Sequence, residues 1–170
     1  MSGKAIVAAV THLKASAANE KVRKRQVLQL LQEIDDEAKS VALTERLNGD
    51  VPILILGDFN ADPPPQLGFS GESSVGQVLK HKLIGNRSTP ASPERYRSAY
   101  EINDPAKLFT TWKIRGKNEA KRVIDYIFYG GPLNCTSTLD APSTEEIEPS
   151  KLPGFRYPSD HLLIAAKFKL

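Results

Sequence analysis

The feature that most constrains the fold is a near-continuous apolar run at residues 51–57, Val-Pro-Ile-Leu-Ile-Leu-Gly, followed at once by polar residues. An uninterrupted apolar strand, unlike an alternating one, is typical of a strand covered on both faces, as in α/β proteins. Pro52 fits only near the start of such a strand, because proline lacks the backbone donor that a central strand needs. The run therefore predicts a buried strand in a chain of α/β class.

The preceding segments support this class. Residues 5–10 are small and β-branched apolar residues, which predict a strand ending at Thr11-His12. Residues 17–47 have the spacing of a helix, with Asn48-Gly49 as its left-handed stop. The apolar stripe of this helix comprises Val27, Leu28, Leu31, Ile34, Ala38 and Val41. This order predicts one sheet layer with one long covering helix.

The rest of the chain predicts further strands and an irregular middle. The strands are expected at residues 108–114, 123–129, 133–139 and 162–168. Residues 68–93 are rich in Gly, Ser and Pro, with a short helix expected at 75–81. A length of 170 residues favours one domain, and no apolar run approaches the roughly 20 residues that span a bilayer.

The composition places few limits on function. A net charge of +3 is compatible with a polyanionic substrate but does not indicate one. The single cysteine, Cys135, excludes an internal disulfide framework and suits a reducing compartment. We expect an intracellular protein, with the cytoplasm as the first expectation and the mitochondrion or nucleus as alternatives.

Several polar residues lie where a strand ends or interrupt an apolar strand. Asp58 and Asn60 follow the buried strand, and their spacing of two would place both side chains on one side, although both types also form turns. Asp125 lies inside the apolar residues 123–129, where a carboxylate needs a partner such as an imidazole unless the position is exposed. Asp160 and His161 precede the last strand as a carboxylate and a titratable ring, or as ordinary loop residues.

Basic residues offer a second set of candidates. His12 and Lys14 follow the first strand and could donate to a phosphate, although a structural histidine is the alternative for His12. The run Lys21–Arg25 could contact RNA or act as a localisation signal, or it could be the solvated face of the long helix.

Five motifs occur along the chain in a fixed order. They are THLKA at 11–15, GDFNA at 57–61, TTWKIR at 110–115, IDYI at 124–127 and YPSDH at 157–161. Together they resemble the endonuclease/exonuclease/phosphatase superfamily, in its nocturnin-like and Ccr4-like branch, over nearly the whole chain. The resemblance implies a DNase I-like four-layered α/β sandwich built from two similar halves.

The resemblance also implies catalytic and metal-binding roles. Asp58 and Asn60 would contact the scissile phosphate and its attacking water, and Asp125 would orient His161. Asp160 would lie close to a Mg²⁺ ion, directly or through water, with Asp58 as a second metal residue.

The substrate residues follow from the same resemblance. His12 would hydrogen-bond a phosphoryl oxygen together with Asn60, and Lys14 and Arg115 would bind a phosphorylated nucleotide. Ser16 stands where similar sequences tend to carry an arginine, so one substrate contact differs here.

The family's principal magnesium glutamate lies in the first half of the domain, and only eleven residues precede His12. Residues 1–170 are therefore expected to form one partial catalytic domain, its C-terminal half. We expect weak Mg²⁺ binding, little turnover by the isolated chain, and an uncovered sheet face that meets the other half or self-associates.

Three functions are compatible with these residues. The first is a magnesium-dependent hydrolase that removes the 2′-phosphate of NADP(H), which Lys14 and Arg115 favour. The second is a poly(A)-specific 3′–5′ exoribonuclease that uses the same catalytic set. The third is a non-catalytic RNA- or protein-binding module.

Overall fold

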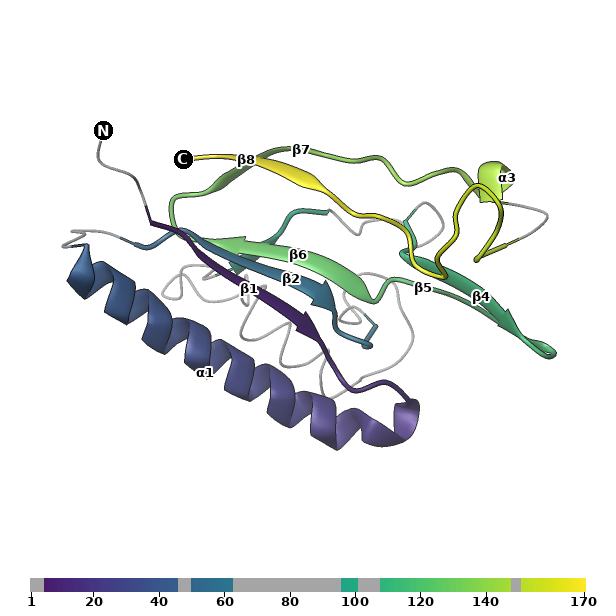
Figure 1. Ribbon diagram of the computed structural model, residues 1–170, viewed down its shortest axis with the longest axis horizontal. Helices are drawn as coiled ribbons and strands as arrows, with labels where there is room; N and C mark the ends of the chain where they lie inside the picture. Colours follow the sequence, from purple (N-terminus) through teal and green to yellow (C-terminus); the bar gives the residue numbers. More distant parts are fainter. Residues whose placement is uncertain (1–4, 46–49, 63–95, 101–107, 148–150) are drawn as a thin grey trace, which may run out of the picture.

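The computed structural model describes residues 5–45, 50–62, 96–100, 108–147 and 151–170 (Figure 1). Its strands are β1 (Val7–His12), β2 (Ile53–Asp58), β3 (Tyr96–Ser98), β4 (Thr111–Arg115), β5 (Asn118–Arg122), β6 (Asp125–Gly130), β7 (Asn134–Thr138) and β8 (Ala166–Lys169). Its helices are the 3₁₀ turn η1 (Ala17–Asn19), α1 (Glu20–Thr44) and α3 (Thr144–Ile147). The α/β class predicted from the sequence is confirmed.

The main sheet has the strand order β1-β2-β6-β3. Strand β1 runs parallel to β2, whereas β6 is antiparallel to both β2 and β3. The register pairs His12 with Asp58, and Asp58 in turn with Asp125. Three polar residues, each at the end of its strand, therefore lie in one row across the sheet.

Helix α1 runs along one side of this sheet (Figure 1). Its buried side chains Val27, Leu31 and Ile34 pack in one core with Ile53 and Ile55 of β2. Leu28 was expected in the apolar stripe, but it is exposed. The buried stripe extends instead to Arg23, which lies about one turn before Val27 on the same face of the helix. Leu28, one residue after Val27, is rotated from it by about 100° around the helix.

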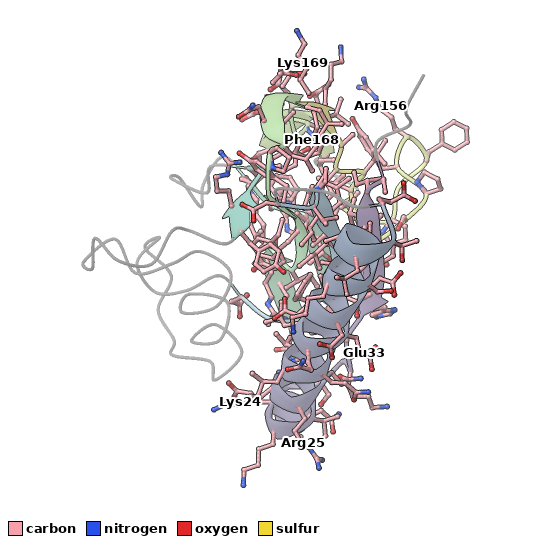
Figure 2. The ribbon with its side chains drawn as sticks, turned by 90° about the vertical axis from the view of Figure 1, so that its left-hand side faces the viewer. Lys24, Arg25, Glu33, Arg156, Phe168 and Lys169 are labelled. Carbon is pink, nitrogen blue, oxygen red and sulfur yellow. The ribbon has the colours of Figure 1, made fainter. Side chains whose placement is uncertain are left out.

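The predicted single layer is divided, since β4–β5 and β7–β8 form separate two-stranded sheets. The β7–β8 pair lies on the side of the main sheet opposite α1 (Figure 1), and the rings of Tyr129 and Phe168 are 5.1 Å apart. Figure 2 shows the labelled Phe168 of β8 and the labelled Lys24 and Arg25 of α1 at opposite ends of the view. A second core joins β4 to the C-terminal segment. It contains Phe109, Trp112, Ile147, Leu152 and Leu162.

The element boundaries differ modestly from expectation. The long helix is preceded by η1, and the strand expected from residue 108 begins at Thr111. Strands β3 and β5 and helix α3 were not predicted. The expected helix at 75–81 and the Asn48-Gly49 stop lie outside the described residues. None of the helices in the described part of the chain is long and apolar enough to cross a membrane.

Candidate active site

The site forms where β1 and β2 end and β6 begins. Backbone hydrogen bonds continue the row beyond the strands: the Leu13 N–H donates to the Asp58 carbonyl at 2.8 Å, and the Phe59 N–H donates to the Ile124 carbonyl at 2.8 Å. Gly57 has φ +136, and a Cβ there would overlap the carbonyl oxygen of Thr11. Glycine therefore allows β1 and β2 to approach closely just before Asp58.

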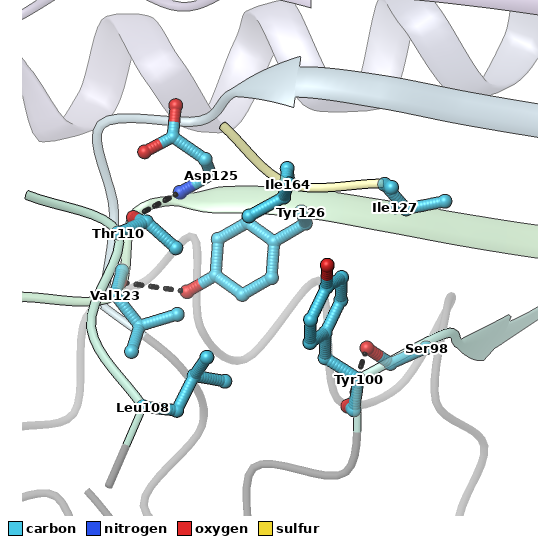
Figure 3. Close-up of a pocket in the computed structure, with 9 residues that line it drawn as sticks. All are labelled: Ser98, Tyr100, Leu108, Thr110, Val123, Asp125, Tyr126, Ile127 and Ile164. Carbon is cyan, nitrogen blue, oxygen red and sulfur yellow. Dashed lines mark hydrogen bonds between the residues drawn. The ribbon is translucent and has the colours of Figure 1, made fainter. Parts of the chain in front are cut away.

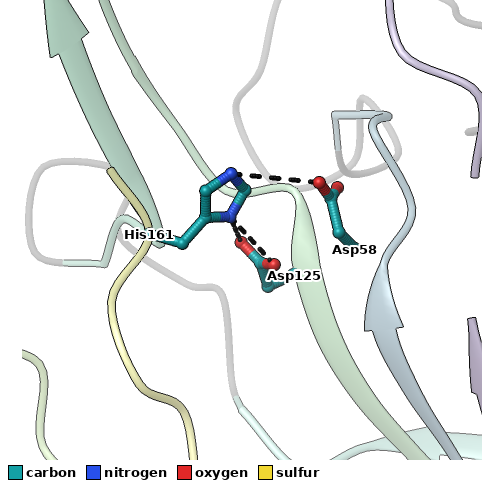
Figure 4. Close-up of side chains that lie close together, drawn as sticks. All are labelled: Asp58, Asp125 and His161. Atoms are coloured by element: carbon teal, nitrogen blue, oxygen red, sulfur yellow. Dashed lines mark hydrogen bonds and ion pairs between the residues drawn. The ribbon is translucent and has the colours of Figure 1, made fainter. Parts of the chain in front are cut away.

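The imidazole of His161 lies against the carboxylate of Asp125, although 36 residues separate them (Figure 4). Its Nδ1 is 3.1 Å from Oδ1 and 2.9 Å from Oδ2 of Asp125. An Nδ1–H donated to the carboxylate leaves Nε2 free of that bond, and Nε2 lies 3.9 Å from Oδ2 of Asp58. The structure thus brings together the two residues for which the sequence suggested a partnership.

Asp58 and Asn60 form a tight corner after β2. The Asn60 backbone N–H donates to Asp58 Oδ1 at 2.7 Å, and its side-chain amide donates to Asp58 Oδ2 at 3.1 Å and to the Leu13 carbonyl at 2.9 Å. Asn60 has φ 48, a left-handed conformation that asparagine tolerates better than most residues. The turn and the convergent side chains, considered as alternatives from the sequence, occur together.

Burial governs the protonation of Asp125. Its side chain is 14% exposed, and the loss of solvent raises the pKa of its carboxyl group. Hydrogen bonds from the Thr110 hydroxyl and from His161 oppose this rise in pKa, because they stabilise the ionised form. The carboxylate is thus held next to the imidazole in a partly desolvated position, where an ion pair is stronger than in water.

Three side chains are close enough to share a metal ion. One ligand atom each from Asp58, Asp125 and His161 lies within 4.8 Å of the others. Asp160, which the sequence suggested as a metal residue, lies outside this group. Its carboxylate pairs with Lys113 Nζ at 2.9 Å, which lowers the pKa of Asp160. Asp58 offers the hard oxygen ligand that Mg²⁺ prefers. The imidazole of His161 is a ligand more typical of zinc, copper, iron or nickel than of Mg²⁺.

Two of the basic candidates, His12 and Lys14, lie at the rim of the site, where β1 ends. His12 Nε2 is 3.5 Å from Asp58 Oδ2, and its side chain is 74% exposed, which leaves it accessible to a ligand. Lys14 is also exposed, two residues beyond the row. Arg115 ends β4, and its side chain is outside what the structure describes.

Thr110 and Thr111 are buried and connect the start of β6 to the segment that carries Asp160 and His161. Thr111 begins β4, and Thr110 precedes it. The sequence analysis assigned neither residue a role. The Thr110 hydroxyl accepts from the backbone N–H groups of Ile124 and Asp125 at 3.0 and 3.1 Å. The Thr111 hydroxyl donates to the Asp160 carbonyl at 2.7 Å, and Thr111 forms an isolated antiparallel β-bridge with His161. Both threonines lie in the TTWKIR motif, which contributed to the family resemblance without showing that their hydroxyls hold the site together.

A small pocket lies on the side of Asp125 next to Tyr126 (Figure 3). Its wall is largely apolar and includes residues from β3, β6 and the C-terminal segment. The lining residues are Ser98, Tyr100, Leu108, Thr110, Val123, Asp125, Tyr126, Ile127 and Ile164. The pocket therefore reaches the catalytic candidate Asp125 and the hydroxyl-bearing Thr110.

The fold, together with the Asp-His pair and the Asp-Asn corner at one end of its sheet, defines the class of protein to which the chain belongs. The chain belongs to the endonuclease/exonuclease/phosphatase family, whose model matches residues 28–161.

Within that family the chain is similar to nocturnin. It is 36% identical to nocturnin of Rattus norvegicus, over 98% of this chain and 34% of the relative. The probable CCR4-Not complex 3′-5′-exoribonuclease subunit Ccr4 of Encephalitozoon cuniculi is 26% identical, over 98% of this chain and 32% of the relative. The chain thus spans about a third of the length of these relatives.

Solved structures give the same picture. The human nocturnin catalytic domain with a bound sulfate anion is 28% identical with a TM-score of 0.54, covering 94% of this chain and 45% of that one. The 2′,3′-cyclic phosphatase ANGEL2 is 20% identical with a TM-score of 0.64, covering 94% and 55%, which shows the fold alone. The predicted resemblance to this branch, and the DNase I-like fold, are confirmed.

Proposed function

We propose that the protein is a magnesium-dependent phosphoester hydrolase of the nocturnin type, which removes the 2′-phosphate of NADP(H). The observation that carries the proposal is the convergence of His161, Asp125 and Asp58 on one point from three separate segments of the chain. Phosphoester hydrolysis requires a group that orients water and groups that offset charge on the phosphoryl oxygens. Family membership and the similarity to nocturnin support the same reaction class.

Each side chain has a role that its contacts suit. Asp58 and the side-chain amide oxygen of Asn60, Oδ1, orient the attacking water. The side-chain N–H groups of Asn60 already donate to the Asp58 carboxylate and to the Leu13 carbonyl. Asp125 holds His161 through Nδ1, so that Nε2 is available to the phosphoryl group of the substrate. There Nε2 forms a hydrogen bond or transfers a proton. His12 and Lys14, both exposed at the rim, donate to phosphate oxygens.

Magnesium suits the oxygen donors of this site. Asp58 would hold the ion, and Asp160 would contribute from the neighbouring loop once its carboxylate exchanges Lys113 for the ion or for a bound water. Mg²⁺ typically keeps several waters and uses one or two carboxylates, so a sparse donor set fits it. When bound, the ion offsets negative charge on the phosphoryl oxygens.

The second candidate is a poly(A)-specific 3′–5′ exoribonuclease. It is favoured by the similarity to Ccr4 proteins described as 3′-5′-exoribonuclease subunits. The same catalytic residues serve both reactions, so only the substrate distinguishes them. A non-catalytic RNA- or protein-binding module, the third possibility, has no need for a partly buried Asp-His pair.

The test is to measure phosphate release from NADPH and shortening of poly(A) by the full-length protein, with Mg²⁺ and with EDTA. We expect Mg²⁺-dependent phosphate release that exceeds RNA shortening. Shortening of poly(A) without phosphate release would instead establish the exonuclease.

Two variants test the site itself. Asp58→Asn and His161→Asn should each lower kcat by about 10²–10⁴-fold, the range for removing a positioned acid–base group. Asp36→Asn is the matched control, because Asp36 is an exposed carboxylate that is hydrogen-bonded to Gln32 and Lys39 of its own helix, α1. Normal function in the two site variants would favour the binding module.

A further inference from the structure

The loop between β1 and η1, residues 13–16, links the site to helix α1. On the site side it is held by two hydrogen bonds: the Leu13 N–H donates to the Asp58 carbonyl, and the Leu13 carbonyl accepts from the Asn60 amide. The position of Lys14, the next residue, therefore depends on what holds the other end of this loop.

Helix α1 provides that second attachment through two side chains. Arg23 Nη1 donates to the Lys14 carbonyl at 3.0 Å and to the Ser16 carbonyl at 2.5 Å. The Lys14 N–H in turn donates to Gln26 Oε1 at 3.0 Å. Both backbone polar groups of Lys14 are thus fixed by α1, one turn of helix apart, which restricts where its side chain can begin.

The loop has an unusual conformation at the point that Arg23 holds. Ser16 has φ 80, in the left-handed region that residues other than glycine disfavour. Such a conformation persists only where surrounding contacts impose it. The bond from Arg23 to the Ser16 carbonyl is a contact of this kind.

Arg23 is a costly residue to use for this purpose. It is 6% exposed, and its Nε is buried without a hydrogen-bond partner. Moving a charged group out of water costs folding free energy relative to an apolar side chain of similar size. Its neighbours Lys21, Lys24 and Arg25 are exposed, so only Arg23 of this basic run turns inward.

We propose that Arg23, supported by Gln26, is a positioning residue that holds Lys14 in place for a phosphate group of the substrate. The inference rests on the proposed function, because it takes Lys14 as a phosphate ligand. It assigns a role to the basic run that differs from both sequence interpretations: one member of the run acts inside the protein, through a loop, and the others lie in solvent.

The experiment compares Arg23→Met, Arg23→Lys, Lys14→Met and the double variant Lys14→Met/Arg23→Met with the unchanged full-length protein. Lys24→Met is the matched control, since it removes one positive charge from the next residue of the same helix without touching the loop. The measurements are the Kd for inorganic phosphate by calorimetry, and kcat and KM for NADPH. Circular dichroism reports whether each variant is folded.

We expect Arg23→Met to weaken phosphate binding and to raise KM by roughly tenfold, an energy difference typical of one lost contact. The kcat should change little, because His161, Asp125 and Asp58 are untouched. Arg23→Lys should recover part of the affinity, and Lys24→Met should match the unchanged protein. The double variant should be no weaker than Lys14→Met, because residues that act through one contact are not additive.

Additive losses in the double variant would overturn the inference, as would an equal loss of affinity in Lys24→Met or the absence of phosphate binding by the unchanged protein. If Arg23→Met does not fold, Lys14→Met/Arg23→Lys replaces the double variant and is compared with Lys14→Met by the same criterion. Phosphate binding with the expected pattern, but without turnover of NADPH, would refute the proposed function and leave the role of Arg23 standing.

Discussion

At the scale of single residues, the site combines side chains that are unfavourable for stability. Asp125 is a carboxylate with 14% exposure, and Arg23 is a buried cation. Ser16 and Asn60 are both non-glycine residues with positive φ. These costs are found beside the candidate catalytic groups and in the loop that joins them to α1. Strain and desolvation of this kind commonly accompany functional sites.

The replacement Asp125→Asn separates function from stability. Burial raises the folded-state pKa of Asp125 above its unfolded value of about 3.9, so the ionised carboxylate opposes folding at neutral pH. This penalty disappears as the pH falls through the folded-state pKa and the group becomes protonated. Asparagine is neutral at every pH and can still accept from the His161 Nδ1–H.

We therefore expect Asp125→Asn to match or exceed the parent Tm at pH 7, with the difference shrinking towards roughly pH 4. Its kcat should nevertheless fall by about 10²–10⁴-fold. Thermal unfolding followed across this pH range is the measurement. A Tm at pH 7 well below that of the parent would mean that the ionised pair stabilises the fold.

At the scale of elements, the site depends on how closely β1 and β2 approach each other. The row of His12, Asp58 and Asp125 forms only because β1 pairs with β2 up to its last residue. Gly57 permits this pairing beside Thr11. On the opposite side, the Thr110–Thr111 dipeptide bonds to the backbone of both Asp125 and Asp160.

Replacing Gly57 by alanine should disturb this junction. The added Cβ would overlap the Thr11 carbonyl, and φ +136 is unfavourable for an L side chain, so we expect a loss of about 3 kcal/mol or more. Gly116→Ala is the control: it also has positive φ, at +62, but a Cβ there meets nothing within 4 Å, and about 1 kcal/mol is expected. Urea unfolding midpoints compare the two, and equal losses would show that the close approach is unimportant.

At the scale of the whole molecule, the main sheet has an apolar edge. Strand β1 is an edge strand of the main sheet in the described part of the chain. Ile6, just before β1, and Val10, within it, are 47% and 80% exposed. Exposed apolar side chains on an edge strand promote pairing with another chain. The self-association expected from the sequence therefore stays a prediction, now attached to a particular strand.

Sedimentation velocity over a range of concentrations tests it. We expect the sedimentation coefficient to rise with concentration and Val10→Lys to reduce this rise. Leu43→Lys is the control, because Leu43 is equally exposed but lies near the end of α1. An unchanged coefficient at all concentrations, or the same effect from both variants, would contradict the prediction.

The sequence by itself determined the local features of this protein. The apolar run at 51–57, the helical spacing after residue 17 and the ordered motifs predicted the α/β class, β2, α1 and the family. They could be predicted because an apolar run, a helical period and a motif can each be recognised within a short stretch of the chain. The same patterns singled out Asp58, Asn60, Asp125 and His161 as candidates.

The family resemblance implied that Asp125 orients His161, but only the tertiary structure shows how the two side chains come into contact. The contact between His161 and Asp125 depends on the pairing of β6 with β2 and on the bridge from Thr111 to His161, neither of which has a local signature. The inward turn of Arg23 had the same origin: a basic run of five residues is indistinguishable from a solvated face until the packing of α1 shows which side is buried. Long-range pairing and the rotation of a helix about its axis are properties of the folded chain, and a single sequence records them only weakly.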